Sequence, residues 1–259
     1  MGTEIRDYQG YTTKMQKSMY DKMFFVDKVF DENIDAIIDF GCADGELILH
    51  LHTFWPNVRY IGYDIDSVML KKAKEKVGFA EFYNKWDDIQ FNPETTLLNL
   101  SSVLHEVEHY STEEELKAFW NLLLHTGFKY ITVRDMFSDE EKMCSASWKT
   151  NVKDAGYQKE LEDFEKVWGD IATNVQKMHF LLKYRYKENW GRELHENYFP
   201  MSKKVFLRKM VESGDYQVEH CVFSSLPYIV FQVKKELGLN IANEATHLRV
   251  IFKKKDRRA

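Results

Sequence analysis

The sequence predicts an α/β protein built around a doubly wound, mostly parallel sheet. Three observations support this fold class: short apolar runs alternate with helical patterns, a glycine-rich turn follows the first run, and acidic residues follow the second. Strands that alternate with helices are joined by right-handed crossovers, which make the strands parallel within one sheet. The carboxyl ends of such strands lie at one edge, where a ligand can bind.

The first strand is expected over residues 36–40, because an apolar run there stops at Gly41. The apolar period then becomes helical and ends at Pro56, so this unit consists of a strand, a turn and a helix. The unit recurs along the first half of the chain. Strands are expected over 58–63, 79–83, 97–100 and 130–133, and helices over 68–77 and 113–125. Ahead of this region, apolar residues three and four positions apart predict an amphipathic helix over about 12–31.

The second half begins with a long helical pattern. Between 157 and 186 the apolar residues keep a helical period with no strand between them, which predicts a helical insertion. Strands are then expected over 216–223 and 246–252, with a helix over 226–237. We expect one compact domain in three parts: a cofactor-binding part over 1–137, the insertion or lid over 138–200, and a part over 201–259 that completes the sheet and ends in a basic tail.

Composition places the chain among globular proteins. Its 259 residues are 44% hydrophobic, which is enough for a sizeable core. The longest apolar runs fall far short of the roughly 18 residues that a membrane helix needs. Three widely spaced cysteines without a CxxC pair or a secretory signal predict reduced thiols. We therefore expect a cytoplasmic protein that does not enter a membrane.

The positive charge is concentrated in the last third of the chain. The net charge is −5 overall, yet residues 177–259 hold 17 Lys and Arg against 9 Asp and Glu. Aromatic residues alternate with basic ones from Lys183 to Trp190 and again from Lys203 to Lys209. Such patterns occur on surfaces that bind RNA or another polyanion, and they also occur on ordinary helices with solvated lysines.

Glycines and acidic residues follow the first two strands. Gly41 and Gly45 allow backbone angles and close approaches that a side chain would block. Asp39 ends the first strand, and Asp64 follows the second, 23 residues after Gly41. A carboxylate at that position can accept hydrogen bonds from both hydroxyls of a ribose. A dinucleotide site would use the motif G-x-G-x-x-G, which is absent here.

Three motifs in this order, D-x-G-x-A-D-G, Y-D-I-D and L-S-S-V-L-H, resemble those of the class I S-adenosylmethionine-dependent methyltransferases over about residues 34–135. The resemblance implies a Rossmann-like sheet with an antiparallel last strand, S-adenosylmethionine as cofactor, and methyl transfer as the reaction. An acidic first motif suits a cationic cofactor and would repel a pyrophosphate. Carried over residue by residue, Asp39, Gly41, Ala43 and Gly45 match the first motif and Asp64 matches the ribose-binding acid, with Ile65 beside it. Further candidates for the cofactor site are Cys42, Ser101 and, after the third strand, Trp86 and Asp87, with a core position as the alternative for Trp86. Ala43 replaces the usual second glycine of the family.

The stretch HEVEH at residues 105–109 matches the zinc-peptidase pattern HExxH. A peptidase needs both histidines on one helix, whereas His105 falls at a strand end and Thr112 begins a capping box for a new helix. We expect a short turn beside the acceptor pocket and no metal site, and zinc peptidase remains a distant alternative. His105 is then a candidate general base or a polar wall. The further catalytic candidates are Tyr110, Asp135, Glu106 and His109.

The methyl acceptor is not specified by these motifs. The basic third favours RNA or another anionic acceptor, while a small molecule enclosed by the insertion is the alternative. The N-P-P-Y type motif of amino-methylating nucleic-acid enzymes is absent after the fourth strand, where Asn99-Leu100-Ser101-Ser102 stands. A protein that binds without catalysis is disfavoured, because the residues expected to hold the cofactor are intact.

Overall fold

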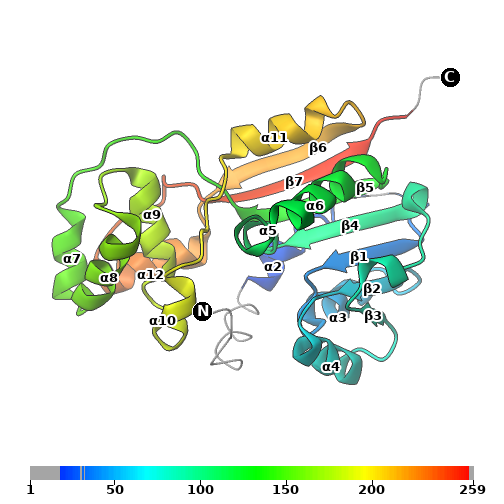
Figure 1. Ribbon diagram of the computed structural model, residues 1–259, viewed down its shortest axis with the longest axis horizontal. Coiled ribbons are helices and arrows are strands. Elements are labelled where there is room, and N and C mark those ends of the chain that lie inside the picture. Colours follow the sequence, from blue (N-terminus) through cyan, green and yellow to red (C-terminus); the bar gives the residue numbers. More distant parts are fainter. Residues whose placement is uncertain (1–17, 30, 32, 257–259) are drawn as a thin grey trace. The chain divides into compact units, whose positions relative to one another are not determined.

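The computed structural model describes residues 18–256 except 30 and 32. Seven strands form one sheet in the order β3-β2-β1-β4-β5-β7-β6 (Figure 1). They are β1 (Ala36–Phe40), β2 (Arg59–Tyr63), β3 (Glu81–Tyr83), β4 (Thr96–Ser101), β5 (Tyr130–Met136), β6 (Tyr216–Ser224) and β7 (His247–Lys254). The pairs β1–β2, β1–β4, β2–β3 and β4–β5 are parallel, while β7 runs in the opposite direction. The predicted sheet is therefore confirmed, including its antiparallel last strand.

The helices of the first half are α2 (Met19–Lys22), α3 (Glu46–His52), α4 (Ser67–Lys76), α5 (Leu104–Tyr110) and α6 (Glu113–His125), with the short 3-10 helices η1 (Trp86–Asp88) and η2 (Pro93–Thr95). The helices predicted after the first and second strands and over 113–125 are present as α3, α4 and α6, whereas α2 and α5 differ from the prediction. Later come α7 (Trp148–Asp154), α8 (Gln158–Trp168), α9 (Asn174–Lys183), η3 (Lys187–Asn189), α10 (Trp190–Glu193), α11 (Lys203–Glu212) and α12 (Pro227–Leu237).

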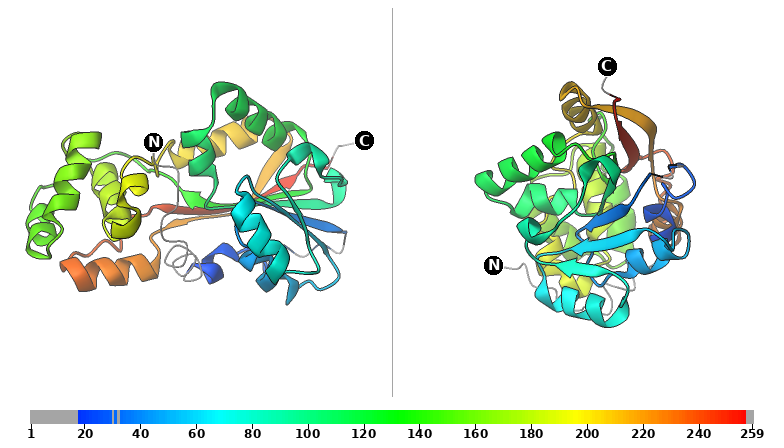
Figure 2. Two further views of the ribbon diagram at one scale, coloured as in Figure 1. Left: turned by 60° about the horizontal axis from the view of Figure 1, so that its bottom comes forward. Right: turned by 90° about the vertical axis from the view of Figure 1, so that its right-hand side faces the viewer.

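The sheet is covered on both faces (Figure 2). Side chains of α2, α3 and α4 pack in one core with alternate strand residues such as Ile37 and Leu97. On the opposite face, Phe40 contacts Phe119 of α6, with ring centroids 5.5 Å apart. Burial on both faces explains why the strands appear in the sequence as nearly continuous apolar runs.

Two helix starts carry the capping residues that the sequence indicates. The side chain of Asp66 accepts hydrogen bonds from the backbone N–H groups of Val68 and Met69 at the start of α4. Thr112 and Glu115 form the predicted capping box at the start of α6. Such caps satisfy backbone donors that have no partner within the helix.

The long helix expected over 12–31 is wrong for the described residues after Lys22. Only Met19–Lys22 is helical, and successive turns follow through residue 28, while residues 12–17 and 30 lie outside the described part. In the turns both Phe24 and Phe25 are buried. Consecutive residues of a helix point about 100° apart, so a continuous helix would direct only one of these rings at the core.

The chain divides into two compact units. One contains most of the sheet, namely the described residues up to Asp135, Leu207–Val222 and the described residues from Arg249 onward. The other contains Met136–Phe206 and Phe223–Leu248. The predicted insertion therefore shares its unit with α12, whose Val233 and Leu237 join the core of α7, α8 and α9. No helix of the described residues combines the length and hydropathy that a membrane span requires.

The unit that contains the insertion buries four charged side chains within one short segment. Lys183, Arg192, Glu193 and Glu196 are each at most 9% exposed. The ammonium of Lys183 lies 4.6 Å from the ring centroid of Tyr198 and 5.1 Å from that of Trp168. Some of the alternating basic and aromatic residues from Lys183 onward are therefore buried and do not contribute to a binding surface.

Candidate functional site

The turn after β1 is tied to the end of β2. The backbone N–H groups of Gly41 and Cys42 both donate to the carbonyl oxygen of Tyr63, with N···O distances of 2.8 and 3.0 Å. Gly41 has a φ of +78°, and a Cβ at this position would lie 2.5 Å from Cγ2 of Val103. Only glycine fits without strain here, because any other residue would adopt a disfavoured backbone and overlap its neighbour.

Asp64 fixes the next residue of this turn. Its Oδ2 accepts a hydrogen bond from the N–H of Ala43 at 2.8 Å, and its Oδ1 accepts one from the N–H of Asp66 at 2.8 Å. Ala43 has a φ of +46°, a region that costs a non-glycine residue about 1–2 kcal/mol. Burial raises the pKa of Asp64, and the backbone donors oppose that rise. A carboxylate has about four lone-pair sites, so Asp64 can also accept a hydrogen bond from a ligand hydroxyl.

A row of buried polar side chains crosses the sheet next to this turn. Asp39, Asn99 and Thr132 are neighbours in register on β1, β4 and β5. Nδ2 of Asn99 donates to Oδ1 of Asp39 at 2.7 Å, and Oγ1 of Thr132 donates to Oδ1 of Asn99 at 2.8 Å. Burial raises the pKa of Asp39 to about 6, although the bond from Asn99 and the charge of Lys22 lower it.

Lys22 of α2 reaches the same edge of the sheet and was not predicted. Its side chain is buried, and burial together with the charge of Arg134 lowers its pKa to about 8, whereas Asp39, Asp135 and Glu106 raise it. One sequence signal could have identified it. Lys22 comes three residues after Met19 and four before Val26, so on a helix it would lie on the apolar stripe, where a lysine is unusual.

Asp135 holds both the start of α5 and the ring of His105. Its Oδ2 accepts a hydrogen bond from the N–H of Leu104 at 2.7 Å, and its Oδ1 lies 2.6 Å from Nδ1 of His105. An ionised carboxylate only accepts hydrogen bonds, so Nδ1 carries the proton, and a neutral ring then has its lone pair at Nε2. The structure thus joins two predicted catalytic residues in a pair that can accept a proton.

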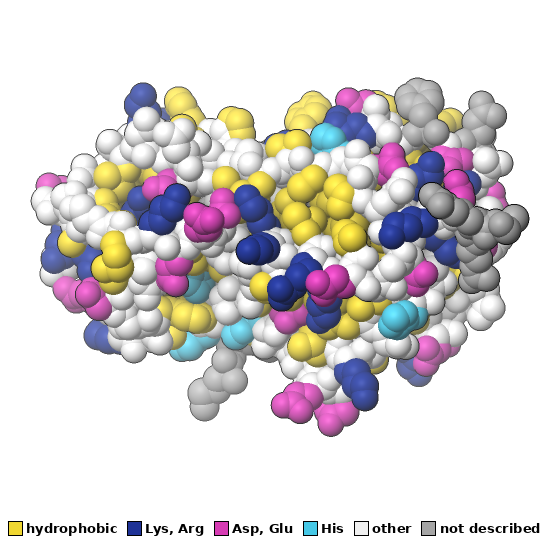
Figure 3. Space-filling model, turned by 90° about the horizontal axis from the view of Figure 1, so that it is seen from above, with side chains coloured by type: hydrophobic (Ala, Val, Ile, Leu, Met, Phe, Trp, Pro, Cys, Tyr) yellow, Lys and Arg dark blue, Asp and Glu magenta, His cyan; other side chains and the backbone are white. Residues whose placement is uncertain are grey.

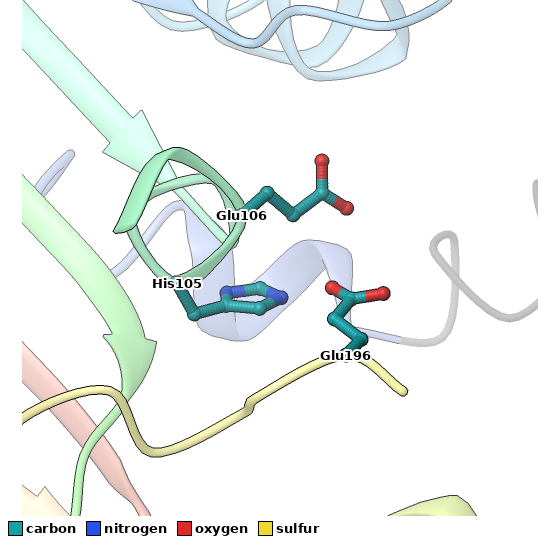
Figure 4. A group of neighbouring side chains, drawn as sticks. All are labelled: His105, Glu106 and Glu196. Atoms are coloured by element: carbon teal, nitrogen blue, oxygen red, sulfur yellow. The ribbon is translucent and has the colours of Figure 1, made fainter. Parts of the chain in front are cut away.

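The residues after β4 form a helix, which corrects the short turn expected there. HEVEH lies within α5, whose first turn is held by Asp135. Figure 4 shows the side chains of His105 and Glu106 projecting from this helix. Among the described residues, no group of three or more His, Cys, Asp or Glu ligand atoms within 4.8 Å of one another includes His109.

The other predicted cofactor residues differ in exposure. Gly45 precedes α3 with a φ of +75°. Cys42 packs in the core beside β1, and burial raises the pKa of its thiol. Ser101 is 6% exposed, and its Oγ finds no hydrogen-bond partner in the described part of the chain. Ile65 is 83% exposed beside Asp64.

Of three further predicted site residues, Trp86 packs on the rings next to the turn, whereas Asp87 and Tyr110 are exposed. Trp86 packs among aromatic rings, 5.7 Å from the centroid of Phe40 and 5.5 Å from that of Tyr63. Asp87 is exposed in η1. Tyr110 ends α5, is 40% exposed, and stacks edge-on against His109.

Comparison with known proteins shows the fold. No protein-family model matches the chain, and no curated protein matches it by sequence. The plantazolicin methyltransferase BamL, in complex with a triazolic desmethylPZN analogue and SAH, is 12% identical, with a TM-score of 0.55 over 96% of this chain and 88% of that one. The methyltransferase domain of bacterial CtHen1-C is 12% identical, with a TM-score of 0.51 over 91% and 97%.

The [4+2]-cyclase SpnF is also similar, with 11% identity and a TM-score of 0.54 over 93% of this chain and 83% of that one. The chain therefore has the Rossmann-like fold of the class I methyltransferases. A cyclase with the same fold shows that the fold alone does not determine the reaction, which has to be inferred from the site.

We predict that Gly41→Ala destabilises the protein by about 2–5 kcal/mol, because a left-handed alanine and an overlap with Val103 both contribute. Gly127→Ala is the matched control, since Gly127 also has a positive φ but meets only the flexible end of Lys254. Denaturant unfolding should show a cost of about 1 kcal/mol for the control. Equal costs for the two variants would contradict the tight approach of the turn to Val103.

The free energy of unfolding should rise between pH 8 and 10.5 through Lys22. Its pKa is about 8 in the fold and 10.5 in the unfolded chain, so the unfolded state binds more protons in this window. One proton contributes at most about 1.4 kcal/mol per pH unit. Lys22→Met should remove this part of the slope in chemical unfolding measured across the window. A slope unchanged by the substitution would show that Lys22 titrates normally.

Proposed function

We propose that the chain is an S-adenosylmethionine-dependent methyltransferase whose acceptor gives up a proton to His105. The observation that carries this proposal is the fixed position of Asp64, which its bonds to Ala43 and Asp66 hold beside the turn after β1. In this fold a carboxylate at the end of β2 can accept the hydroxyls of a ribose. The likeness to methyltransferases of known structure supports the proposal.

The residues present fit this cofactor. A side chain at Gly41 would overlap Val103, so glycine is needed for the turn to keep the conformation that places Asp64 beside it. Ser101 offers a buried hydroxyl that has no partner among the described residues. Ile65 offers an exposed apolar surface to a planar base. Asp39 and Asp64 supply negative charge, which suits the cationic sulfonium and amino groups of S-adenosylmethionine. When bound, the cofactor supplies an activated methyl group.

His105 gives the site a group that can accept the proton of the acceptor. Asp135 fixes the proton on Nδ1, so the basic nitrogen of the ring is Nε2. Asp135 also stabilises the positive charge that the ring gains when it takes up a proton. General-base catalysis helps only when the nucleophile is protonated, so we infer a hydroxyl or a protonated nitrogen as the methylated group.

The acceptor is inferred to be a compact molecule, and RNA is the second candidate. Lys183 is buried, Nε of Arg185 lies 3.2 Å from Oε2 of Glu236, and Nζ of Lys203 lies 3.1 Å from Oδ2 of Asp139. Lys209 lies over the ring of Trp120, 3.5 Å from its centroid. Figure 3 shows Lys and Arg side chains interspersed with acidic and apolar ones on one face. Cations with internal partners contribute little to binding of a polyanion.

Asp64→Ala should weaken binding of S-adenosylhomocysteine about ten- to a hundredfold, because charge-assisted hydrogen bonds worth about 1.5–3 kcal/mol are lost. Isothermal titration calorimetry measures the dissociation constant. Asp66→Ala is the matched control: it removes the cap of α4 and costs stability, yet it should leave affinity within about twofold. Equal affinity of the wild type and Asp64→Ala would show that another residue binds the ribose.

Asp135→Asn should lower the rate of methyl transfer by about 10²- to 10⁴-fold, because the ring of His105 loses the partner that fixes its tautomer. The measurement is transfer of labelled methyl to the extract fraction that accepts it. Glu108 lies on α5 with His105 and accepts a hydrogen bond from Trp120 of α6, so Glu108→Gln is the control and should retain activity. A rate that does not depend on Asp135 would exclude the pair as the base.

Methyl transfer should respond weakly to salt. A compact acceptor gives a shallow dependence, whereas single-stranded RNA gives a slope of log K against log salt of about −0.7 per phosphate contacted. The assay compares the wild type with Lys204→Gln and Arg208→Gln at low and moderate salt. A steep slope that these substitutions reduce would favour RNA as the acceptor.

A further inference from the structure

Lys22 places a cationic side chain at the carboxyl edge of the sheet, where little of it is exposed to water. Its side chain is 5% exposed, and within the described part of the chain its Nζ makes no hydrogen bond or ion pair. Buried ammonium groups are normally paired, because removal from water is costly unless hydrogen bonds or an opposite charge replace the hydration. An ammonium at the edge of the sheet that no hydrogen bond or ion pair of the described residues holds therefore indicates a position suited to an anionic group.

The neighbouring residue explains why Lys22 stays in this position. Oδ2 of Asp21 lies 2.6 Å from Nε of Arg134 on β5, and Oδ1 of Asp21 lies 3.0 Å from Nη1 of Arg249 on β7. Nη1 of Arg134 also donates to Oγ of Ser102, at the end of β4, at 2.6 Å. These bonds fasten α2 to the carboxyl ends of β4 and β5, so Lys22 is held where the cofactor is proposed to bind.

The charges around Lys22 suggest which anion it takes. Asp39, Asp135 and Glu106 are close enough for their charges to act on it, and Arg134 opposes them. These carboxylates favour a cationic ligand group, while the ammonium of Lys22 is a single positive charge near them that favours an anionic group. A ligand group that is zwitterionic, with an ammonium and a carboxylate on adjacent atoms, matches this arrangement.

We propose that Lys22 binds the carboxylate of the amino-acid part of S-adenosylmethionine and so selects a cofactor with an intact carboxylate. The proposal rests on the proposed function. Lys22 is then a positioning residue, because it holds the far end of the cofactor and takes no part in the transfer. Its role differs from that of Asp64, which is assigned to the ribose.

Truncated ligands test the assignment. Calorimetry with the whole protein would measure three ligands: S-adenosylhomocysteine, its decarboxylated analogue S-adenosyl-3-thiopropylamine, and 5′-methylthioadenosine. The wild type should bind S-adenosylhomocysteine about ten- to a hundredfold more tightly than the decarboxylated analogue. Lys22→Met should lose the same factor for S-adenosylhomocysteine and less than about twofold for the two ligands without a carboxylate.

Two further variants separate this role from a structural one. Lys22→Arg keeps the charge and should recover part of the preference for the carboxylate. Lys28→Met removes an exposed lysine of the same segment and should bind all three ligands as the wild type does. Equal weakening of all three ligands in Lys22→Met, or no weakening, would overturn the assignment. Failure of the wild type to bind any of them would instead overturn the proposed function.

Discussion

Three backbone donors in the turn after β1 bond to the end of β2, and the geometry of the site depends on them. Gly41 and Cys42 donate to the carbonyl oxygen of Tyr63, and Ala43 donates to the side chain of Asp64. These bonds set the conformation of the turn, which only glycine can adopt at Gly41, and they aim the carboxylate of Asp64 at the same edge. Packing of neighbouring parallel strands thus holds the carboxylate of Asp64 in a defined position.

Several charged side chains are buried at the same edge of the sheet, although charged groups are rarely buried in a protein core. Asp39 shares a hydrogen-bonded row with Asn99, and Asp135 is satisfied by the start of α5 and by His105. Lys22 lies among these groups without a bond of its own in the described residues. This combination of carboxylates and a cation is the arrangement on which the proposed contact with the amino-acid part of the cofactor rests.

Local patterns predicted the parts of the fold that local interactions stabilise. The helix expected over 113–125 coincides with α6. Its capping box lies within four consecutive residues, so the start of the helix can be recognised from local sequence. By contrast, α5 begins where Asp135 accepts a bond from Leu104, 31 residues earlier in the chain, and Lys22 is placed by a pair that joins Asp21 to Arg134 across 113 residues. Likewise, the pattern around Lys183 cannot distinguish a cation buried among aromatic rings from one on an RNA surface.

Hydrogen–deuterium exchange with and without S-adenosylhomocysteine tests most directly whether this edge is a cofactor site. Bound cofactor should slow exchange in the turn at 41–45 and in the segment from Asp64 to the start of α4, because the ligand covers these backbone amides and stabilises their bonds. Protection confined to these segments and to α2 is the predicted result. No protection, or protection only elsewhere in the chain, would contradict the assignment of the cofactor site.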